Sequence, residues 1–322
     1  MKRIKLGTRG SDLALWQAHY VERLLKDNGY DVELVVITTT GDVHGSGPII
    51  RLGAQGVFSK EIERALLAGE IDLAVHSLKD LPTDPVSGLL LAGTPVRGPV
   101  EDVFISNTYK KVKDLPEGAK VGTGSLRRKT QLLYQYKRAF CVEDIRGNVE
   151  TRLAKLDRGE YDAIILAAAG LERLGLSQRV TCRLQVPEFL PAPGQGAIAL
   201  ETREGDEETN DAVATINDQA TFLSVLAERS FLLTLQGGCI APIAACARFD
   251  DSTLTLLGRV ISLDAKQMYE TKVAGEIARN ASRAEQQEEA VKMGRAAAEQ
   301  LLHNGADEVV AAVQALRERS GV

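Results

Sequence analysis

Residues 121–128 read VGTGSLRR and place two glycines and two arginines where a predicted strand leads into a predicted helix. The pattern before them ends a strand at Lys120–Val121, and the pattern after them predicts a helix over Ser125–Tyr136. A strand that passes directly into a helix is typical of α/β folds, in which ligands lie at the carboxyl ends of the strands. The stretch therefore predicts an α/β fold with a ligand site at this junction.

The residues of this junction suit an anion. Glycine lets a ligand approach the backbone, and the N–H groups at a helix N-terminus favour negative charge. Arg127 and Arg128 can each donate two hydrogen bonds to a carboxylate or a phosphate, and Thr123 and Ser125 add hydroxyls. The alternative is that Ser125 only caps the helix and that both arginines face solvent.

Two other predicted helix N-termini also carry basic residues. They are Arg9 beside Ser11 in TRGS (residues 8–11), and Arg146 and Arg152 around the expected cap Asn148 in RGNVETR (residues 146–152). Cations are unfavourable at the positive end of a helix dipole, and an anionic ligand would explain them. The loops match neither the P-loop nor the dinucleotide pattern, which favours carboxylates over nucleotide phosphates. Taken alone, Arg9 could be solvated and Ser11 a simple cap.

Residues 75–83 read VHSLKDLPT and follow a predicted buried strand. Lys79 and Asp80 lie at the exit of that strand, before Pro82 prevents a helix from continuing. An acid beside a lysine can act as a general acid or base, and Asp80 is the candidate catalytic residue. The alternative is a surface ion pair between the two side chains. We interpret His76 as structural.

The N-terminal two thirds of the chain alternate strands and helices. Further strands are predicted at Lys5–Thr8, Glu33–Thr38, Ile71–Val75 and Asp162–Ala168, and further helices at Asp12–Asp27, Ser59–Leu67 and Asn148–Arg158. We expect largely parallel sheets in two lobes around a cleft. The charged segment Asp206–Asp211 is predicted to be a connection, and no internal sequence repeat is evident.

The C-terminal third changes pattern. A helix from about Asp218 to Leu233 precedes predicted strands at Ile243–Phe249, Leu254–Ser262 and Met268–Ala274, and helices follow from about Ala284 and Asp307. Strands grouped in this way predict a small antiparallel sheet. The fold class is thus α/β, with two lobes like those of periplasmic binding proteins and a C-terminal α+β domain. The expected domains are residues 1–95 with 197–214, residues 100–192, and residues 218–322.

Composition excludes several classes of function. The chain has 322 residues, 44% of them hydrophobic, which is enough to bury a core. A formal net charge of −5 argues against nucleic acid as the main partner. The charged N-terminus does not resemble a secretory signal, and no apolar run could span a membrane, so we expect a cytoplasmic protein.

The four cysteines form no Cys-x-x-Cys pair, so no metal site is expected. Cys141, Cys182 and Cys246 are expected to be small apolar residues. Cys239 lies in QGGCIAP (residues 236–242), a glycine-rich loop where a thiol could be exposed and act as a nucleophile. From the residues alone, we interpret Cys239 as an ordinary loop cysteine.

Taken together, these motifs resemble the hydroxymethylbilane synthase (porphobilinogen deaminase) family in the same order along nearly the whole chain. The matching stretches are GTRGSDLALWQA (7–18), residues 75–83, 121–128, 146–156 and 161–175, LPAPGQGA (190–197) and the loop around Cys239. The resemblance implies an enzyme that joins four porphobilinogen molecules head to tail, releases ammonia at each step, and releases hydroxymethylbilane by hydrolysis. It also implies a dipyrromethane cofactor held by a thioether to Cys239.

The resemblance assigns roles to single residues. Asp80 would be catalytic, because a carboxylate beside the pyrrole N–H groups can stabilise developing positive charge. The implied cofactor-binding residues are Cys239, Asp80, Lys79, Thr123, Ser125, Arg127, Arg128, Arg146 and Asn148. The implied substrate-binding residues are Arg9, Ser11, Arg146, Arg152, Arg173 and Gln195. We expect porphobilinogen as the only partner, no membrane or nucleic acid, and a monomer.

The chain departs from the family pattern at Gln55, where a lysine is usual, and at Gln236, where an acid is common. Residues 43–50 occupy the place of a covering loop. Two alternatives to this enzyme function stay open on the sequence alone. A solute-binding or ligand-sensing protein could also use two lobes around an anion site, and an inactive relative could keep the fold.

Overall fold

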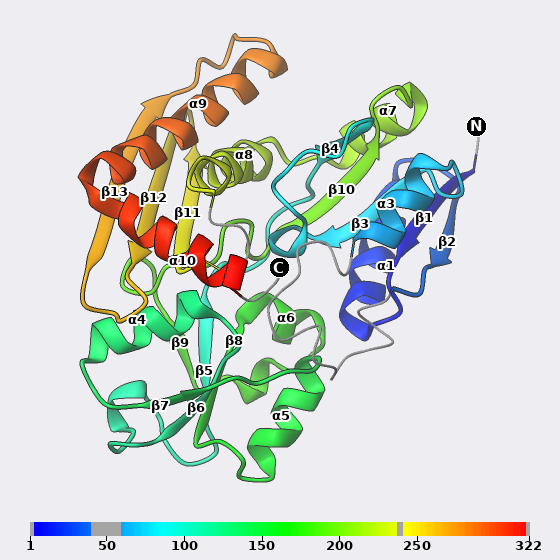
Figure 1. Cartoon of the computed structure of the whole chain (residues 1–322). Coiled ribbons are helices and arrows are strands. Elements are labelled where there is room, and N and C mark those ends of the chain that lie inside the picture. The colour runs from blue at the N-terminus through cyan, green and yellow to red at the C-terminus, as the bar shows by residue number, and fades with distance from the viewer. Residues whose placement is uncertain (1–2, 40–58, 237–240, 320–322) are drawn as a thin grey trace.

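The computed structural model describes residues 3–39, 59–236 and 241–319, and two five-stranded sheets and one three-stranded sheet organise these residues (Figure 1). Each larger sheet is the centre of an α/β lobe, and the smaller sheet belongs to a C-terminal α+β unit. The predicted fold class is confirmed.

The first lobe is built on a sheet with helices on both faces. Its strands, in spatial order, are β2 (Val32–Val36), β1 (Ile4–Thr8), β3 (Leu73–Ser77), β10 (Ile198–Arg203) and β4 (Leu89–Gly93). The helices α1 (Asp12–Asp27) and α7 (Glu207–Ile216) share a core with one face, and α3 (Lys60–Leu67) packs on the other. The helical spacing of Ala18, Val21 and Leu25 puts all three into that first core.

The second lobe has the same construction. Its strands, in spatial order, are β7 (Cys141–Glu143), β6 (Lys120–Gly122), β8 (Ala163–Ala167), β5 (Asp102–Ile105) and β9 (Cys182–Leu184). The helices α4 (Leu126–Tyr136) and α5 (Val149–Asp157) pack against opposite faces of this sheet. A short helix, α6 (Ala168–Arg173), follows β8 directly.

The two sheets repeat one strand order, although the sequence shows no repeat. In both, the strand next to one edge leads into a helix that Ser11 or Ser125 caps, which makes β1 the counterpart of β6. The next strand, β3 or β8, is parallel to it and leads into a short helical turn. Each of the strands β1, β3, β6 and β8 therefore ends at the start of a helix or a helical turn. Side chains at these four junctions can meet between the lobes.

The expectation of largely parallel sheets is wrong, because both sheets are mixed. β10 runs antiparallel to β3 and β4, and β5 runs antiparallel to β8 and β9. A parallel pair needs a crossover that returns the chain to the same end of the sheet. β5 and β10 instead follow residues 94–101 and 185–197, the two segments that carry the chain from one lobe to the other.

The C-terminal unit packs helices on an antiparallel meander (Figure 1). It contains α8 (Gln219–Thr234), β11 (Ile243–Asp250), β12 (Thr253–Ile261), β13 (Met268–Glu276), α9 (Arg283–Leu301) and α10 (Asp307–Arg319). All three predicted strands are present. The predicted connection at Asp206–Asp211 is wrong, because Asp206 accepts a hydrogen bond from the Thr209 N–H (3.2 Å) and begins α7.

Gly294 allows α9 to pack tightly on α8. A Cβ at this position would lie 2.1 Å from the carbonyl oxygen of Ala227 and 2.9 Å from Ser230 Cβ. Ser230 Oγ also donates a hydrogen bond to the Val291 carbonyl oxygen at 2.7 Å. The C-terminal unit therefore depends on a glycine in the middle of a helix, where alanine would otherwise be preferred.

We predict that Gly294→Ala lowers the free energy of unfolding by about 1–3 kcal/mol, because the added methyl forces α8 and α9 apart. Denaturant unfolding followed by circular dichroism measures the change. Ala296→Ser, at an exposed position of α9, should change stability by less than about 0.5 kcal/mol. Equal stability of Gly294→Ala and the unaltered chain would contradict the tight contact.

Candidate functional site

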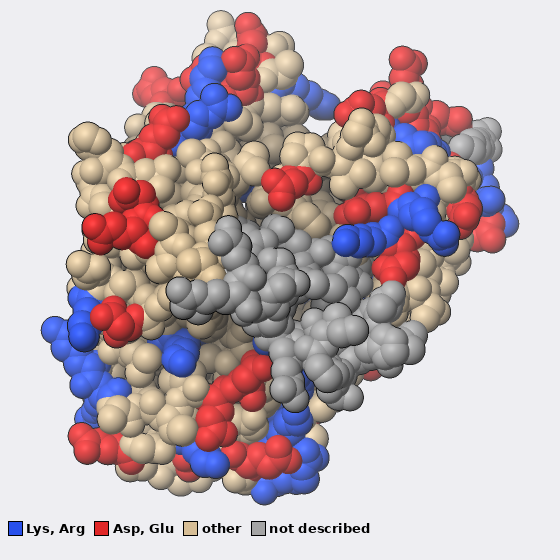
Figure 2. Space-filling model, in the orientation of Figure 1, with Lys and Arg blue, Asp and Glu red and all other residues tan. Residues whose placement is uncertain are grey.

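The charged side chains of the candidate site lie between the lobes and not on the outer surface of the molecule. On the described part of the face in Figure 2, basic and acidic side chains are interspersed. Inside, three charged residues of the second lobe are buried together: Asp102 is fully buried, and Arg127 and Arg128 are nearly so. Burial of charge is unfavourable unless the groups are paired, so these contacts define the site.

The β6–α4 junction forms a tight turn. Ser125 caps α4 by accepting a hydrogen bond from the Arg128 N–H (3.4 Å), and Thr123 Oγ1 accepts one from the Ser125 N–H (3.3 Å). A Cβ at Gly124 would lie 2.8 Å from Asp144 Oδ1 and 3.3 Å from Arg146 Cζ. The absent side chain lets the loop before α5 approach this junction.

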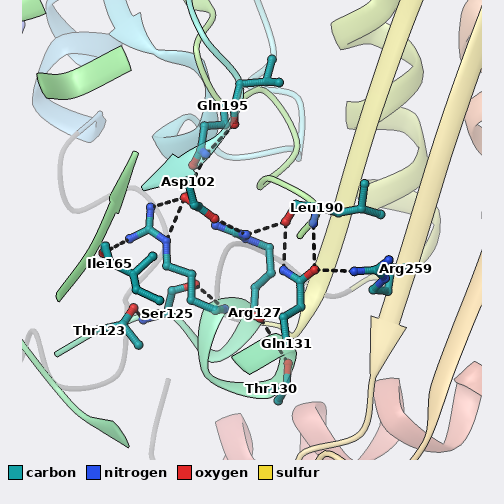
Figure 3. Close-up of polar contacts among 12 residues, drawn as sticks. Asp102, Thr123, Ser125, Arg127, Thr130, Gln131, Ile165, Leu190, Gln195 and Arg259 are labelled. Carbon is teal, nitrogen blue, oxygen red and sulfur yellow. Dashed lines mark hydrogen bonds and ion pairs between the residues drawn. The ribbon is translucent and has the colours of Figure 1, made fainter. Parts of the chain in front are cut away.

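Arg127 and Arg128 share the buried carboxylate of Asp102. Figure 3 labels Arg127 and Asp102. Arg127 Nη1 donates to Asp102 Oδ2 at 2.7 Å, and Arg128 donates to Asp102 Oδ1 from Nη2 at 2.7 Å and from Nε at 3.0 Å. Burial would raise the pKa of the Asp102 carboxyl, but the two guanidinium groups outweigh it and hold that pKa far below its usual range. The alternative of two solvent-facing arginines is therefore wrong.

Backbone carbonyl groups fix the same two arginines further. Arg127 Nη1 also donates to the carbonyl oxygen of Leu190 at 2.6 Å, and Arg128 Nη1 donates to that of Ile165 at 2.9 Å. Sequence reasoning missed Asp102. The available signal was an aspartate at the start of the apolar run DVFI, since a buried carboxylate requires a cation nearby.

Lys79 and Asp80 reach the same region from the first lobe. They form the turn η2 (Leu78–Asp80) at the end of β3, with Lys79 half-buried and Asp80 exposed. Burial lowers the pKa of Lys79 to about 8; Asp80 and Asp102 oppose this shift, and Arg128 and Arg127 reinforce it. Lys79 therefore lies within electrostatic reach of Asp102, Arg127 and Arg128 of the second lobe.

Arg152 and Arg146 extend the basic group along α5. Burial lowers the pKa of Arg152 to about 10, with repulsion from Arg128 and Arg146 adding to the effect and Asp80 and Asp144 opposing it. Arg152 Nε donates to the Gly147 carbonyl oxygen at 2.8 Å, and Arg146 Nε donates to Asp144 Oδ2 at 2.8 Å. The structure thus places Arg152 within electrostatic reach of both Asp80 and Arg146.

Asn148 and the β1–α1 junction have capping roles. Asn148 Oδ1 accepts a hydrogen bond from the Thr151 N–H at 2.8 Å, and Ser11 Oγ accepts one from the Ala14 N–H at 3.4 Å. Arg9 is half-buried at the end of β1. His76 is buried on β3 with Nε2 3.3 Å from Glu201 Oε2, which agrees with a structural role.

Arg173 and Gln195 hold the segments that join the lobes. Arg173 Nη2 donates to the Gly196 carbonyl oxygen at 2.6 Å, and its guanidinium lies over the ring of Trp16 on α1, 5.6 Å from the centroid. Burial lowers the pKa of Arg173 to about 10. Gln195 Nε2 donates to the Val100 carbonyl oxygen (2.7 Å) and to Asp102 Oδ1 (3.0 Å). Gln195 therefore touches the arginine cluster through Asp102.

A second buried carboxylate, Glu228 of α8, was also missed. Arg97 donates to both of its oxygens, at 2.8 and 2.9 Å, and the N–H groups of Gly194 and Ala247 donate at 2.6 and 2.7 Å. These partners belong to both interlobe segments and to β11. Glu228 thereby ties the C-terminal unit to the junction of the lobes.

The surroundings of two described thiols, Cys246 and Cys141, disfavour the reactive thiolate form. Burial and the nearby Glu228 carboxylate raise the pKa of the Cys246 thiol to about 12, and a hydrogen bond to Glu143 raises that of Cys141. Cys239, Gln55 and residues 43–50 lie outside the described residues. Within the described ranges, no group of three His, Cys, Asp or Glu side chains could hold a metal ion. None of the helices described is long and apolar enough to cross a membrane.

The chain is similar to several solved structures, at low sequence identity. A nutrient-binding protein from Burkholderia cenocepacia bound to methionine has 14% identity and a TM-score of 0.41, covering 66% of this chain and 90% of that chain. A periplasmic substrate-binding protein of an ABC transporter from Coxiella burnetii has 14% identity and a TM-score of 0.42, with coverages of 68% and 93%. The VFT2 domain of Bordetella pertussis BvgS has 18% identity and a TM-score of 0.40, with coverages of 66% and 86%.

Family models cover most of the sequence. Residues 4–211 match the dipyrromethane cofactor-binding domain of porphobilinogen deaminase, and residues 222–303 match the C-terminal domain of the same enzyme. The first match includes both lobes and all the charged residues of the interlobe site, and the second includes Glu228 and Cys239. This chain belongs to the porphobilinogen deaminase family.

Proposed function

We propose that Asp80 is the catalytic residue and Cys239 the cofactor anchor of this chain, which as a family member is a transferase with hydroxymethylbilane synthase activity. The enzyme binds porphobilinogen and carries a dipyrromethane cofactor. The observation that carries the proposal is the meeting of Lys79 and Asp80 of one lobe with Arg128 and Arg152 of the other.

The charges of the interlobe site fit a ligand with several carboxylates. Its cations, Lys79, Arg127, Arg128, Arg146 and Arg152, outnumber its carboxylates, Asp80, Asp102 and Asp144. Burial and mutual repulsion lower the pKa values of Lys79 and Arg152, so added negative charge would stabilise both. Each pyrrole of the cofactor and of the substrate carries an acetate and a propionate.

Individual residues can hold these carboxylates without losing their present contacts. Among the described residues, all hydrogen bonds of the Arg127 guanidinium run through Nη1, which leaves other donors for a ligand. Ser125 and Asn148 accept backbone hydrogen bonds, while their O–H and N–H groups can donate. With Lys79, Thr123, Arg128 and Arg146, these residues would bind the cofactor.

The remaining residues would bind the substrate and the growing chain. We assign this role to Arg9, Ser11, Arg146, Arg152, Arg173 and Gln195. When bound, the dipyrromethane supplies the end on which the product chain is extended. Charge-assisted hydrogen bonds from arginine are stronger than neutral ones and fix orientation. We assign Gln195 a further part, because it contacts Asp102 and so the arginines themselves.

We assign the catalytic role to Asp80. Its exposed carboxylate follows the end of β3, and its negative charge acts to raise the pKa values of Lys79 and Arg152. A carboxylate held beside pyrrole N–H groups can stabilise positive charge as it develops on the ring. It can also accept the proton that is lost when a new carbon–carbon bond forms.

We further propose a cytoplasmic monomer that binds no nucleic acid. The net charge of −5 and the interspersed charges on the face in Figure 2 support the absence of nucleic-acid binding. We also propose domains at residues 1–95 with 197–214, 100–192 and 218–322, because each range holds one sheet or most of it.

For the anchor, we predict that protein made in cells that synthesise porphobilinogen carries the added mass of two linked pyrroles. Cys239→Ser should lack this mass, since the thioether needs the sulfur, whereas Cys141→Ser should keep it. Intact mass spectrometry gives the answer. An unmodified wild-type chain would contradict the anchor.

For catalysis, we predict that Asp80→Asn keeps the cofactor but lowers kcat by about a hundredfold or more, because the amide cannot stabilise positive charge. Asp84→Asn, at an exposed acid of the following loop, should keep the wild-type rate. Product formation from porphobilinogen, with cofactor content checked by mass, measures both. A wild-type rate for Asp80→Asn would assign Asp80 another role.

For Lys79, we predict that cofactor loading of apo-protein from porphobilinogen slows about tenfold above pH 8, because the amine loses its charge as pH rises through its lowered pKa and a charged hydrogen bond to the cofactor is lost. Lys79→Arg should remove this slowing, since arginine stays protonated. Intact mass measured over time after porphobilinogen is added, between pH 7 and pH 9, compares the two. Identical pH profiles would show that Lys79 does not contact a cofactor carboxylate.

A further inference from the structure

The buried polar contacts of α4 continue past its arginines toward the C-terminal sheet (Figure 3). Gln131 lies one turn after Arg127 on α4 and is 2% exposed. Its Nε2 donates to the carbonyl oxygen of Leu190, and its Oε1 accepts from the Leu190 N–H, both at 2.9 Å. One side chain thus fixes both polar groups of a residue in the interlobe segment 185–197.

Arg259 completes the connection from β12. Its Nη1 donates to Gln131 Oε1 and to the Glu188 carbonyl oxygen, and its Nη2 donates to the Pro187 carbonyl oxygen, each at 2.8 Å. Within its own sheet it binds Glu270, with Nη2 2.6 Å from Oε1. Arg259 as a whole is 7% exposed, so these bonds form with little competition from water.

Leu190 links this contact to the proposed cofactor site. Its carbonyl oxygen accepts from Gln131 Nε2 and also from Arg127 Nη1, which in turn binds Asp102. The bonded path therefore runs from Arg259 through Gln131 and Leu190 to Arg127. Because every group on it is buried and hydrogen-bonded, a displacement at one end changes the geometry at the other.

We propose that Arg259 and Gln131 are positioning residues that align the C-terminal unit with the arginines of α4. The inference rests on the proposed function in one respect: Cys239, four residues before β11, anchors a ligand whose carboxylates α4 binds. Such a ligand must reach its covalent anchor and its arginines at once. An error of about 1 Å between the two ends can lower a rate about a hundredfold.

The test measures cofactor loading of apo-protein, followed by intact mass after porphobilinogen is added. We expect Arg259→Leu and Gln131→Leu each to slow loading about tenfold, and the double variant to be no slower than either single variant, because both break one path. Glu270→Gln, which removes only the contact within the C-terminal sheet, should load within about twofold of wild type. Thermal unfolding identifies a temperature at which all variants are folded.

A second measurement does not require the cofactor. In a Cys239→Ser background, hydrogen exchange at residues 126–131 and 190 should become faster in Arg259→Leu but not in Glu270→Gln, since α4 loses its outer contact. If Arg259→Leu does not fold, Arg259→Lys replaces it. The lysine amine can reach only some of the oxygen atoms that the Arg259 guanidinium binds, so its loading rate should fall below that of wild type by less than tenfold, and its hydrogen exchange should be faster than in wild type.

The outcomes separate the two proposals. A wild-type chain that never gains cofactor mass overturns the anchor at Cys239, while the exchange result still decides whether Arg259 orders α4. Wild-type loading in both single variants, with lower thermal stability only, would reduce the contact to a domain interface. Losses that multiply in the double variant would also overturn the proposal, because the two residues would then act independently.

Discussion

The carboxylate of Asp102, buried between Arg127 and Arg128, is the interaction on which the interlobe site depends. Breaking a buried ion pair by removing one partner costs about 3–5 kcal/mol, because the remaining charge stays buried. Neither arginine can therefore move independently of the start of β5. Flexible side chains at a helix N-terminus become fixed donors, and an anionic ligand meets them already oriented.

Asp102 is also the point where the rest of the molecule joins the site. Gln195 connects it to the segment that returns the chain to the first lobe, and Glu228 ties both interlobe segments to the C-terminal unit. Lys79 and Asp80 then face the arginines from the other lobe. Under the proposed function, the catalytic acid, the arginines that bind carboxylates and the cofactor anchor belong to three different parts of the chain.

Some of this architecture could be predicted from sequence, and the reasons for success and failure are physical. The helix at Asp12–Asp27 was predicted with its observed bounds, because its apolar stripe is regular and Ser11 caps it. β5 and β10 were missed because short buried strands lack a periodic pattern. The helix α7 was mistaken for a connection, although acids in a first turn favour a helix start.

The site was predicted in part for similar reasons. Strand-to-helix junctions indicated Arg127, Arg128 and Arg146, since a local pattern carries that information. Asp102 lies 25 residues before Arg127, and its position depends on β5 pairing with β8, which no local pattern reveals. The role of Glu228 was not predicted, because its hydrogen-bond partners come from three segments that are distant in the sequence.

The central claim is that the arginines aligned by Asp102 receive the carboxylates of a ligand anchored in the C-terminal unit. An experimental structure of the cofactor-loaded enzyme tests it most directly. The account predicts cofactor carboxylates against Arg127, Arg128 and Arg146, an intact Asp102 cluster, and Asp80 facing the pyrrole nitrogens. Cofactor carboxylates bound elsewhere, with the Asp102 cluster turned away from them, would contradict it.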